Sequence, residues 1–384
     1  NKQIVLVTPT IISPSVKKII SDFKLRYRNF KVVYYDPISQ DAILSANQRC
    51  FGTRFIPTYN FTKAETIVSF DADFLSDWLD PAHARQYTSN RKPENGKMSR
   101  HYHFESLLSV TGSNADKRVP IKPSEMYRYV LSLYYYLTRP QYKGELTNHE
   151  SLIKQIADEL LSNKKKSLVV SGIDNIDLQV IINQINHFLQ NYDYTISTSV
   201  RSNVFSSKNS DINSCISDMN SGNVGVLMFL NTNPVYTLED SEVFSSALEQ
   251  VDTTISFSES LDETSVLCDF VCPTHNYLES WGDLQPYSTF YSLQQPTISP
   301  LFNTRQFEET ILNWLGQNDY HSYLSNFWRS KGIKWEQAVH DGYFTHKDKE
   351  PKLTTIKTLS LDVLSFENSS NKDLELAIYE KIGI

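Results

Sequence analysis

The chain has 384 residues, of which 40% are hydrophobic and 21% charged, and its formal net charge at pH 7 is −7. This composition is typical of a folded globular protein, and the length predicts two to three domains. Dispersed Lys and Arg residues and the acidic balance argue against nucleic-acid binding. Because no apolar run approaches the roughly 18–20 residues that span a bilayer, membrane association is expected only through partners.

The first part of the chain alternates between strand and helix patterns. The expected elements, in chain order, are a strand at residues 4–7, a helix at 16–27, a strand at 31–35, a helix at 42–47, a strand at 65–70 and a Tyr- and Leu-rich helix that ends near residue 138. Alternating strands and helices indicate a parallel sheet with right-handed crossovers.

A second alternation follows. The expected elements are a helix at residues 148–161, a strand at 167–171, a helix at 178–189, a strand at 224–230, a helix at 244–248 and two further helices at 307–315 and 320–328. A polar tail begins near residue 345. We predict an α/β chain with two doubly wound Rossmann-like units, residues 1–145 and 146–316, and a helical and extended connector over 317–384.

Phosphate-binding and hydrolase motifs are absent from the sequence. The chain has 12 glycines and contains neither G-x-G-x-x-G nor G-x-x-x-x-G-K-[ST], so an ordinary dinucleotide or ATP site is not expected. It also has no G-x-S-x-G nucleophile elbow, so hydrolase chemistry has no support.

The four cysteines, Cys50, Cys215, Cys268 and Cys272, are too few and too scattered for a disulfide framework. Cys268 and Cys272 are four positions apart, whereas zinc and iron–sulfur sites generally use two intervening residues and further ligands nearby. We therefore predict buried core thiols, with metal ligation as the alternative.

Two pairs of polar residues are candidate site residues. His101 and His103 alternate, so on a strand they would face one side and could hold a metal or contact a quinol. Without a third ligand nearby, we predict structural histidines instead. Asp71 and Asp73 follow a strand, where open α/β sheets bind ligands, but helix capping is the interpretation we favour.

Residues 231–283 read NTNPVYTLEDSEVFSSALEQVDTTISFSESLDETSVLCDFVCPTHNYLESWGD. They resemble a stretch of the molybdopterin oxidoreductase superfamily that runs from an Asn-Pro loop through a Glu-Thr turn to Ala-Asp-x-x-Leu-Pro and Leu-Glu-x-x-Gly signatures. The matching residues are Asn233, Pro234, Glu263, Thr264, Asp269, Pro273, Leu278 and Glu279. Cys268 and Cys272 stand where the family has apolar residues. The likeness spans roughly residues 1–316 and implies Rossmann-type domains, which in that family hold a bis-dinucleotide molybdenum cofactor.

Residues 115–137, ADKRVPIKPSEMYRYVLSLYYYL, resemble the family segment Ala-Asp-x-x-Leu-Pro-Ile-Arg-Pro-Gly-Thr-Asp, whose final Asp recognises the guanine of the cofactor. Here Pro123 is followed by Ser124, Glu125 and Met126. Loss of the glycine removes close backbone approach to a ligand, and a thioether cannot accept the guanine N–H groups. The dinucleotide site is therefore expected to be dismantled.

The cysteine cluster that is typical of catalytic family members is also missing at the N-terminus. Cys50, in NQRCFG, is the only residue that could be suggested as a molybdenum ligand, and we do not favour that role. We assign no catalytic, cofactor-binding or metal-binding residues to this segment.

Three further segments are SPSVKKIISDF, IPTYNFTKAETIVSFDADFLSDWLDP and MSRHYHFESLLSVTGSNADKRVPIKPSE. They resemble the corresponding region of the large iron–sulfur subunit of bacterial alternative complex III. This resemblance implies a peripheral subunit on the periplasmic face of the inner membrane, in a complex that passes electrons from quinol to cytochrome c or an oxidase. Its implied partners are a multihaem cytochrome and quinol-binding integral membrane subunits. Iron–sulfur clusters are expected elsewhere in such a subunit, and no cofactor in this segment.

Two other classes of function remain open. A catalytic fragment of a polysulfide- or formate-type molybdoenzyme would need molybdenum and a glycine-rich pterin loop. A solute- or nucleotide-sugar-binding α/β protein would need two units that close around a polar ligand. We favour the cofactor-free scaffold, because a specific interface needs only about 800 Å² on each partner, which α/β units of this size can offer.

Overall fold

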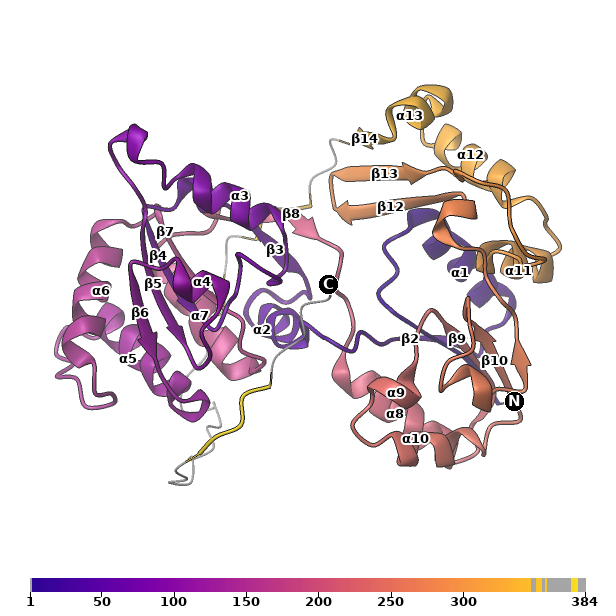
Figure 1. Cartoon of the computed structure of the whole chain (residues 1–384), viewed down its shortest axis with the longest axis horizontal. Helices are drawn as coiled ribbons and strands as arrows, with labels where there is room; N and C mark the ends of the chain where they lie inside the picture. The colour runs from indigo at the N-terminus through magenta and orange to yellow at the C-terminus, as the bar shows by residue number, and fades with distance from the viewer. Residues whose placement is uncertain (1, 347–349, 354–355, 358–373, 379–384) are drawn as a thin grey trace. The chain divides into compact units, whose positions relative to one another are not determined.

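The computed structural model describes residues 2–346, 350–353, 356–357 and 374–378. The chain forms two compact units, and each combines two separate stretches of the sequence (Figure 1). Unit 1 comprises residues 1–41 and 202–349, and unit 2 comprises residues 42–201 and 350–384.

This division corrects the predicted domains 1–145, 146–316 and 317–384. Strand pairing gives the reason. Strand β1 (Gln3–Thr8) pairs with β9 (Val224–Leu230), and β4 (Thr66–Phe70) pairs with β7 (Ser167–Ser171), in both cases in parallel. A local pattern reveals a strand but not its partner, so consecutive α/β segments suggest consecutive domains. Most of the predicted connector beyond residue 346 lies outside the described residues.

Unit 2 is built on a four-stranded parallel sheet of order β6-β5-β4-β7. Its two further strands are β5 (Arg100–Glu105) and β6 (Lys117–Pro120). The helices of this unit are α2 (Asp41–Phe51), α3 (Ala82–Ser89), α4 (Val110–Ser113), α5 (Met126–Thr138), α6 (Glu150–Ser162) and α7 (Ile176–Phe188). Strands β3 (Ile56–Tyr59) and β8 (Ile196–Ser202) are neighbours in another sheet.

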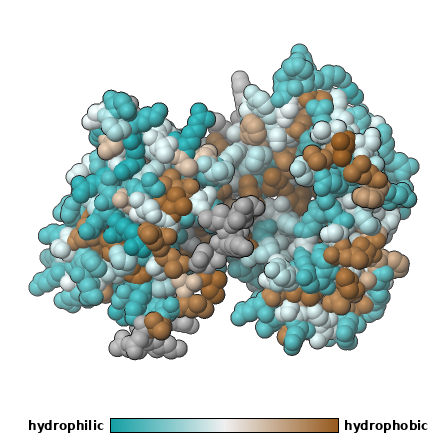
Figure 2. All heavy atoms as spheres, viewed as in Figure 1, coloured by the Kyte–Doolittle hydropathy of each residue, from teal (hydrophilic) through white to brown (hydrophobic). Residues whose placement is uncertain are grey.

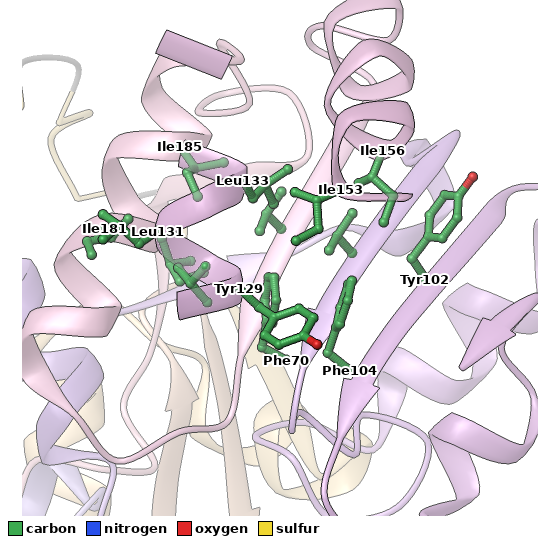
Figure 3. Packing of buried hydrophobic residues seen from close by; sticks show 14 of the residues in the cluster. Phe70, Tyr102, Phe104, Tyr129, Leu131, Leu133, Ile153, Ile156, Ile181 and Ile185 are labelled. Atoms are coloured by element: carbon green, nitrogen blue, oxygen red, sulfur yellow. The ribbon is translucent and has the colours of Figure 1, made fainter. Parts of the chain in front are cut away.

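One face of this parallel sheet carries the main core of unit 2. Alternate side chains of β4 and β5 meet apolar residues from α5, α6 and α7, and these side chains point toward one another in Figure 3. Phe70 and Phe104 stack with ring centroids 4.9 Å apart. The intervening residues of β5 face the opposite side of the sheet, so the same strand supplies both an apolar core and a polar cluster.

Unit 1 contains a five-stranded parallel sheet of order β11-β10-β9-β1-β2. The other strands are β2 (Phe30–Tyr34), β10 (Thr253–Phe257) and β11 (Phe270–Val271). Helices α8 (Asn209–Asn220) and α10 (Ser241–Leu248) belong to the core on one face, and α1 (Pro14–Arg26), α11 (Phe307–Trp314) and α12 (Tyr320–Ser330) to the core on the other. Both faces are covered, as the doubly wound prediction requires.

An antiparallel sheet, β12 (Gly282–Tyr287), β13 (Phe290–Gln294) and β14 (Tyr343–Thr345), was not predicted. Its strands are mostly half-buried and contain no continuous apolar run, which explains why the sequence pattern did not reveal them. The short helices of unit 1 are α9 (Pro234–Thr237) and α13 (Trp335–Asp341). By contrast, the strands expected at residues 167–171 and 224–230 form at those residues, and the α/β fold class is confirmed.

Candidate functional site

A buried polar network lies on the side of β4 and β5 that faces away from the helical core of unit 2. The Ser69 hydroxyl lies 2.7 Å from Nε2 of His101 and also hydrogen-bonds Nδ1 of His103. Nε2 of His103 lies 2.9 Å from Oε2 of Glu105. All four side chains have at most 1% of their surface exposed. The structure thus places both histidines on one side of the strand, as predicted, and adds Ser69 and Glu105.

Both ends of the network are satisfied by hydrogen bonds. Glu105 accepts hydrogen bonds from the backbone and hydroxyl of Ser109 and from Nε of Arg118. At the other end, the Tyr87 hydroxyl lies 3.2 Å from Nδ1 of His101. A Cβ atom added to Gly112 would overlap the Glu105 carboxylate, so a larger residue there would displace this carboxylate. These contacts support the prediction of structural histidines.

Burial and hydrogen bonding set the charges of this network. Burial lowers the pKa of His101 well below its usual range, so this ring is neutral at pH 7. Burial alone would raise the pKa of Glu105, but hydrogen bonds from His103, Ser109 and Arg118 outweigh it and lower the pKa to about 2. Glu105 is therefore a carboxylate at every physiological pH. Within the described residues, no group of three or more His, Cys, Asp or Glu side chains could hold a metal ion.

Asp71 and Asp73 follow β4 and are held by backbone N–H groups. Asp73 accepts a 2.9 Å hydrogen bond from the backbone N–H of Thr111, in the first turn of α4, which supports the capping interpretation. Asp71 has φ of 51°, a left-handed conformation that Asp tolerates, and accepts a hydrogen bond from the backbone of Ser106. Burial raises the pKa of Asp71. Both carboxylates thus serve the loop structure around β4.

All four cysteines are free thiols. Cys50 and Cys215 are fully buried, whereas Cys268 and Cys272, for which the sequence predicts buried core thiols, are only half-buried. Burial raises the pKa of Cys50 to about 11 and those of Cys215 and Cys268 to about 12. A thiol with a raised pKa is a poor nucleophile and a poor metal ligand. Cys50 belongs to a small apolar cluster with Ala46, which gives no support to a role in binding molybdenum.

The segment that follows Pro123 does not present groups for a nucleotide. Met126, the first residue of α5, is 2% exposed and packs in the main core of unit 2. Ser124 donates its backbone N–H and its hydroxyl to the carboxylate of Glu375, at 2.9 Å and 2.5 Å. A carboxylate of the chain itself therefore occupies the donors at the start of this helix. The residues present do not fit the guanine of a molybdopterin dinucleotide.

In unit 1 the structure brings together residues that the family resemblance singled out. The Asn233 side-chain oxygen accepts hydrogen bonds from the backbone and hydroxyl of Thr264, and its amide donates to Glu263 at 2.6 Å. Asp269 accepts from the backbone and hydroxyl of Thr254. These motif residues bind one another, so their polar atoms hold the loops that follow β9 and β10 in place.

The remaining motif residues hold the next turn of unit 1. Glu279 forms a capping box with Asn276 and also accepts a hydrogen bond from the backbone of Leu301. The Leu278 carbonyl accepts from the backbone of Thr297, and the Pro273 carbonyl from that of Arg305. The residues that the resemblance singled out therefore form contacts that shape these loops. No ligand-binding role is assigned to these residues.

Sequence reasoning missed a second buried carboxylate, Asp283 of β12, which is 1% exposed. Its oxygens accept hydrogen bonds from the hydroxyls of Ser13 and Ser15 and, at 2.9 Å, from the indole nitrogen of Trp328. The Ser15 hydroxyl also lies 2.8 Å from that of Tyr320. No local signal marks Asp283, because its partners come from α1 and α12. Glu105, by contrast, continues the alternation of His101 and His103 and could have been found.

Glu308, at the start of α11, should respond to pH in the opposite direction to Glu105. Burial raises the pKa of Glu308 to about 7, and the charge of Asp283 adds to this rise. Because the folded state holds this proton more tightly than the unfolded chain, stability should fall as pH rises from about 4.5 to about 7. We expect Glu308→Gln to raise the free energy of unfolding by about 2 kcal/mol at pH 8, a figure reduced for solvent screening because Glu308 is half-buried. At pH 4 the same substitution should change the free energy of unfolding little.

Denaturant titrations of both proteins at pH 4 and pH 8 measure this difference. Glu309→Gln, one position along the same helix, is the matched control. The charge of Glu309 is a minor cause of the raised pKa of Glu308, so this variant should weaken the pH dependence only slightly. An equal gain for Glu308→Gln at both pH values would contradict the assignment of this proton.

The cavities of unit 2 are small in the region next to α7. An enclosed cavity of about 10 Å³ is lined by Ser171, Gln179, Asn183 and Tyr192, among others. This volume accommodates about one water molecule and no organic cofactor.

Among the described residues, none of the helices has both the length and the apolar character needed to cross a bilayer.

Comparison with solved structures supports the α/β fold described above. Acetylene hydratase from Pelobacter acetylenicus superposes with a TM-score of 0.67 at 11% identity, over 89% of this chain and 60% of that one. The chain has a molybdopterin oxidoreductase fold. A chain of the formyltransferase/hydrolase complex from Methylorubrum extorquens matches with a TM-score of 0.50 at 10% identity, over 81% of this chain and 90% of that one. At these identities the likeness concerns the fold alone.

A curated sequence adds a more specific similarity. The molybdopterin-binding-like subunit of menaquinone reductase from Nitratidesulfovibrio vulgaris is 28% identical over 144 residues. The match covers 36% of this chain, and it spans 20% of the length of that subunit. No family model matches the chain.

Proposed function

We propose that this chain is a cofactor-free scaffold with a molybdopterin oxidoreductase fold, within an electron-transfer subunit of a quinone-linked respiratory complex. The observation that carries the proposal is the start of α5. There Met126 is buried in the core and Ser124 binds Glu375, at the position where the resembled family recognises guanine. A retained fold without those ligand groups is suited to holding partners rather than to molybdenum chemistry.

The proposal extends to the alternative complex III type of assembly. Its support is the resemblance of residues 56–81 and 98–125 to that subunit, together with the similarity to a menaquinone reductase subunit. In this proposal the chain lies on the periplasmic face of the inner membrane, next to a multihaem cytochrome and quinol-binding membrane subunits. Iron–sulfur clusters would be carried elsewhere in the same subunit, and electrons would pass from quinol to cytochrome c or an oxidase.

Elemental mass spectrometry of the chain purified with its complex, combined with organic extraction of pterin, tests the cofactor-free state. We expect less than about a tenth of an equivalent of molybdenum and no extractable pterin, because the buried thioether and the occupied helix start offer no guanine site. Iron bound elsewhere in the complex serves as the internal control for metal recovery. Stoichiometric molybdenum with pterin would overturn the scaffold and favour a catalytic molybdoenzyme fragment.

A further inference from the structure

Unit 1 exposes a set of large apolar side chains around the edge strand β11, which we call the β11 surface. Its residues have between 59% and 77% of their surface exposed: Leu261, Val266, Phe270, Tyr277, Leu301 and Phe302. Figure 2 shows hydrophobic residues gathered over the side of this unit that carries β10. Exposed apolar groups of this number are unusual on a protein that has no partner, because each could leave water by binding one.

Hydrogen bonds tie the loops of the β11 surface together. The Asn276 side chain donates to Glu259 at 2.9 Å, which joins the loop after β10 to the loop after β11. The backbone N–H of Leu301 donates to Glu279 at 3.0 Å, which brings in the third loop. The apolar side chains therefore belong to one connected part of the fold.

Strand β11 lies at the end of its sheet. It pairs with β10 through Phe270 and Val271, and within the described residues it has no strand on its other side. The N–H and C=O groups along such an edge can pair with an extended segment of another polypeptide.

The segment of the chain that carries this surface is rich in acidic residues, and the exposed Arg305, whose backbone N–H donates to the Pro273 carbonyl, lies beside it. Residues 209–304 contain 13 of the 44 Asp and Glu residues and none of the 37 Lys and Arg residues. The rest of the chain therefore has a formal excess of six positive charges. Glu239, Asp240 and Glu242 follow α9, whose Val235 backbone N–H donates to the Thr264 hydroxyl in the loop that carries Leu261 and Val266. All three are exposed, and in the described part of the chain no ion pair involves them. A segment with positive charge is the electrostatic complement of this region.

We propose that the β11 surface docks an extended segment of another subunit of the complex, in which apolar residues alternate with Lys or Arg. The apolar side chains of that segment would cover Phe270 and its neighbours, and its cations would meet the acidic residues around them. Docking onto a lipid surface is disfavoured, because anionic headgroups repel a region with a marked excess of acidic residues. This inference rests on the proposed function for the presence of partner subunits, and it adds where one of them binds and what its chemistry is.

Photo-crosslinking in the full protein, expressed in its host membranes, tests the proposal. The photoreactive residue p-benzoylphenylalanine is placed at position 270 and, as the control, at position 25, because Leu25 of α1 is 76% exposed and lies outside the β11 surface. We expect position 270 to yield an adduct whose mapped peptide belongs to another subunit and contains apolar residues with at least two Lys or Arg. Position 25 should not yield that adduct. Adducts to lipid, to the same chain or to no protein would overturn the proposal.

Charge reversal supplies a second measurement. We expect the double variant Asp240→Lys/Glu242→Lys to reduce the crosslink at position 270 at least fivefold, while its melting temperature stays within about 2 °C of the parent, because both residues are exposed. An unchanged crosslink would contradict the electrostatic part of the proposal.

The elemental mass spectrometry described above distinguishes failure of the scaffold proposal from failure of the docking proposal. Stoichiometric molybdenum with an intact crosslink overturns only the scaffold function, and a molybdenum-free protein without the crosslink overturns only the docking site.

Discussion

Replacing Glu105 by Gln should lower the free energy of unfolding of unit 2 by about 3 kcal/mol at pH 7. The carboxylate is 1% exposed and accepts hydrogen bonds from His103, Ser109 and Arg118. A Gln side chain offers one acceptor oxygen in place of two and turns two N–H donors toward groups that also donate. It also removes the buried negative charge that offsets Arg118, and breaking a buried pair on one side is strongly destabilising.

The pH dependence of stability gives this prediction a sign. The pKa of Glu105 is lowered from its usual 4.5 to about 2 by the folded state. Its contribution to stability is therefore fully present above about pH 4.5 and is lost as the pH falls toward 2. The difference between Glu105→Gln and the parent protein should shrink over this same range, and denaturant titrations between pH 2.5 and 7 measure it.

Glu159→Gln is the matched control for Glu105→Gln. Glu159 accepts a hydrogen bond from Tyr102 at 2.8 Å, on the other face of the sheet, and its side chain is 26% exposed. We expect its loss to cost about 1 kcal/mol or less, as is usual for partly exposed pairs. Equal losses for the two variants would contradict a special role for the buried network. Gly112→Ala should be destabilising as well, because its Cβ would displace the Glu105 carboxylate.

Asp283→Ala should lower the free energy of unfolding of unit 1 by about 3–5 kcal/mol. The substitution removes the acceptor of Ser13, Ser15 and Trp328 and leaves these donors buried without a partner. It also removes the carboxylate that links Ser15 of α1 to Trp328 of α12 through hydrogen bonds. Intrinsic Trp fluorescence during urea unfolding reports the change directly, because Trp328 is one of the donors.

The isosteric variant Asp283→Asn separates the hydrogen bonds from the charge. It keeps one acceptor oxygen, so we expect it to recover about half of the loss. Burial raises the pKa of Asp283, although the hydrogen bonds from Ser13, Ser15 and Trp328 oppose this effect. The cost of Asp283→Ala should therefore persist at pH 4, where a simple surface carboxylate would matter little. Asp22→Ala, which removes an exposed pair with Lys18, is the control and should cost less than about 1 kcal/mol.

In the proposed scaffold, the two networks would let the fold form without a cofactor. In unit 2 the polar atoms beneath the sheet bind one another, and in unit 1 Asn233 and Thr264 hold the loops after β9 and β10. Hydrogen bonds within the chain take the place that ligand contacts could otherwise fill. In the proposed scaffold, the stability of the fold therefore does not depend on a bound ligand. Such a scaffold can function through the surfaces that it offers to its partners.

The sequence by itself determined the α/β class and most element positions, because apolar periodicity is a local property of the chain. The alternation of His101 and His103 placed these side chains on one face of a strand before any contact was known. The substitution of Met126 for an acidic residue was likewise readable from the sequence, since a thioether cannot accept a hydrogen bond from guanine.

Only the tertiary structure decided which distant segments meet. The pairing of β1 with β9 moves the first 41 residues into a unit with the second half of the chain, and no local pattern encodes it. The partners of Asp283 lie 268 to 270 positions earlier in the sequence and 45 positions later. The carboxylate that binds Ser124 comes from Glu375. Such contacts depend on the packing of whole elements, because burial and hydrogen bonding become favourable only when the elements have already assembled.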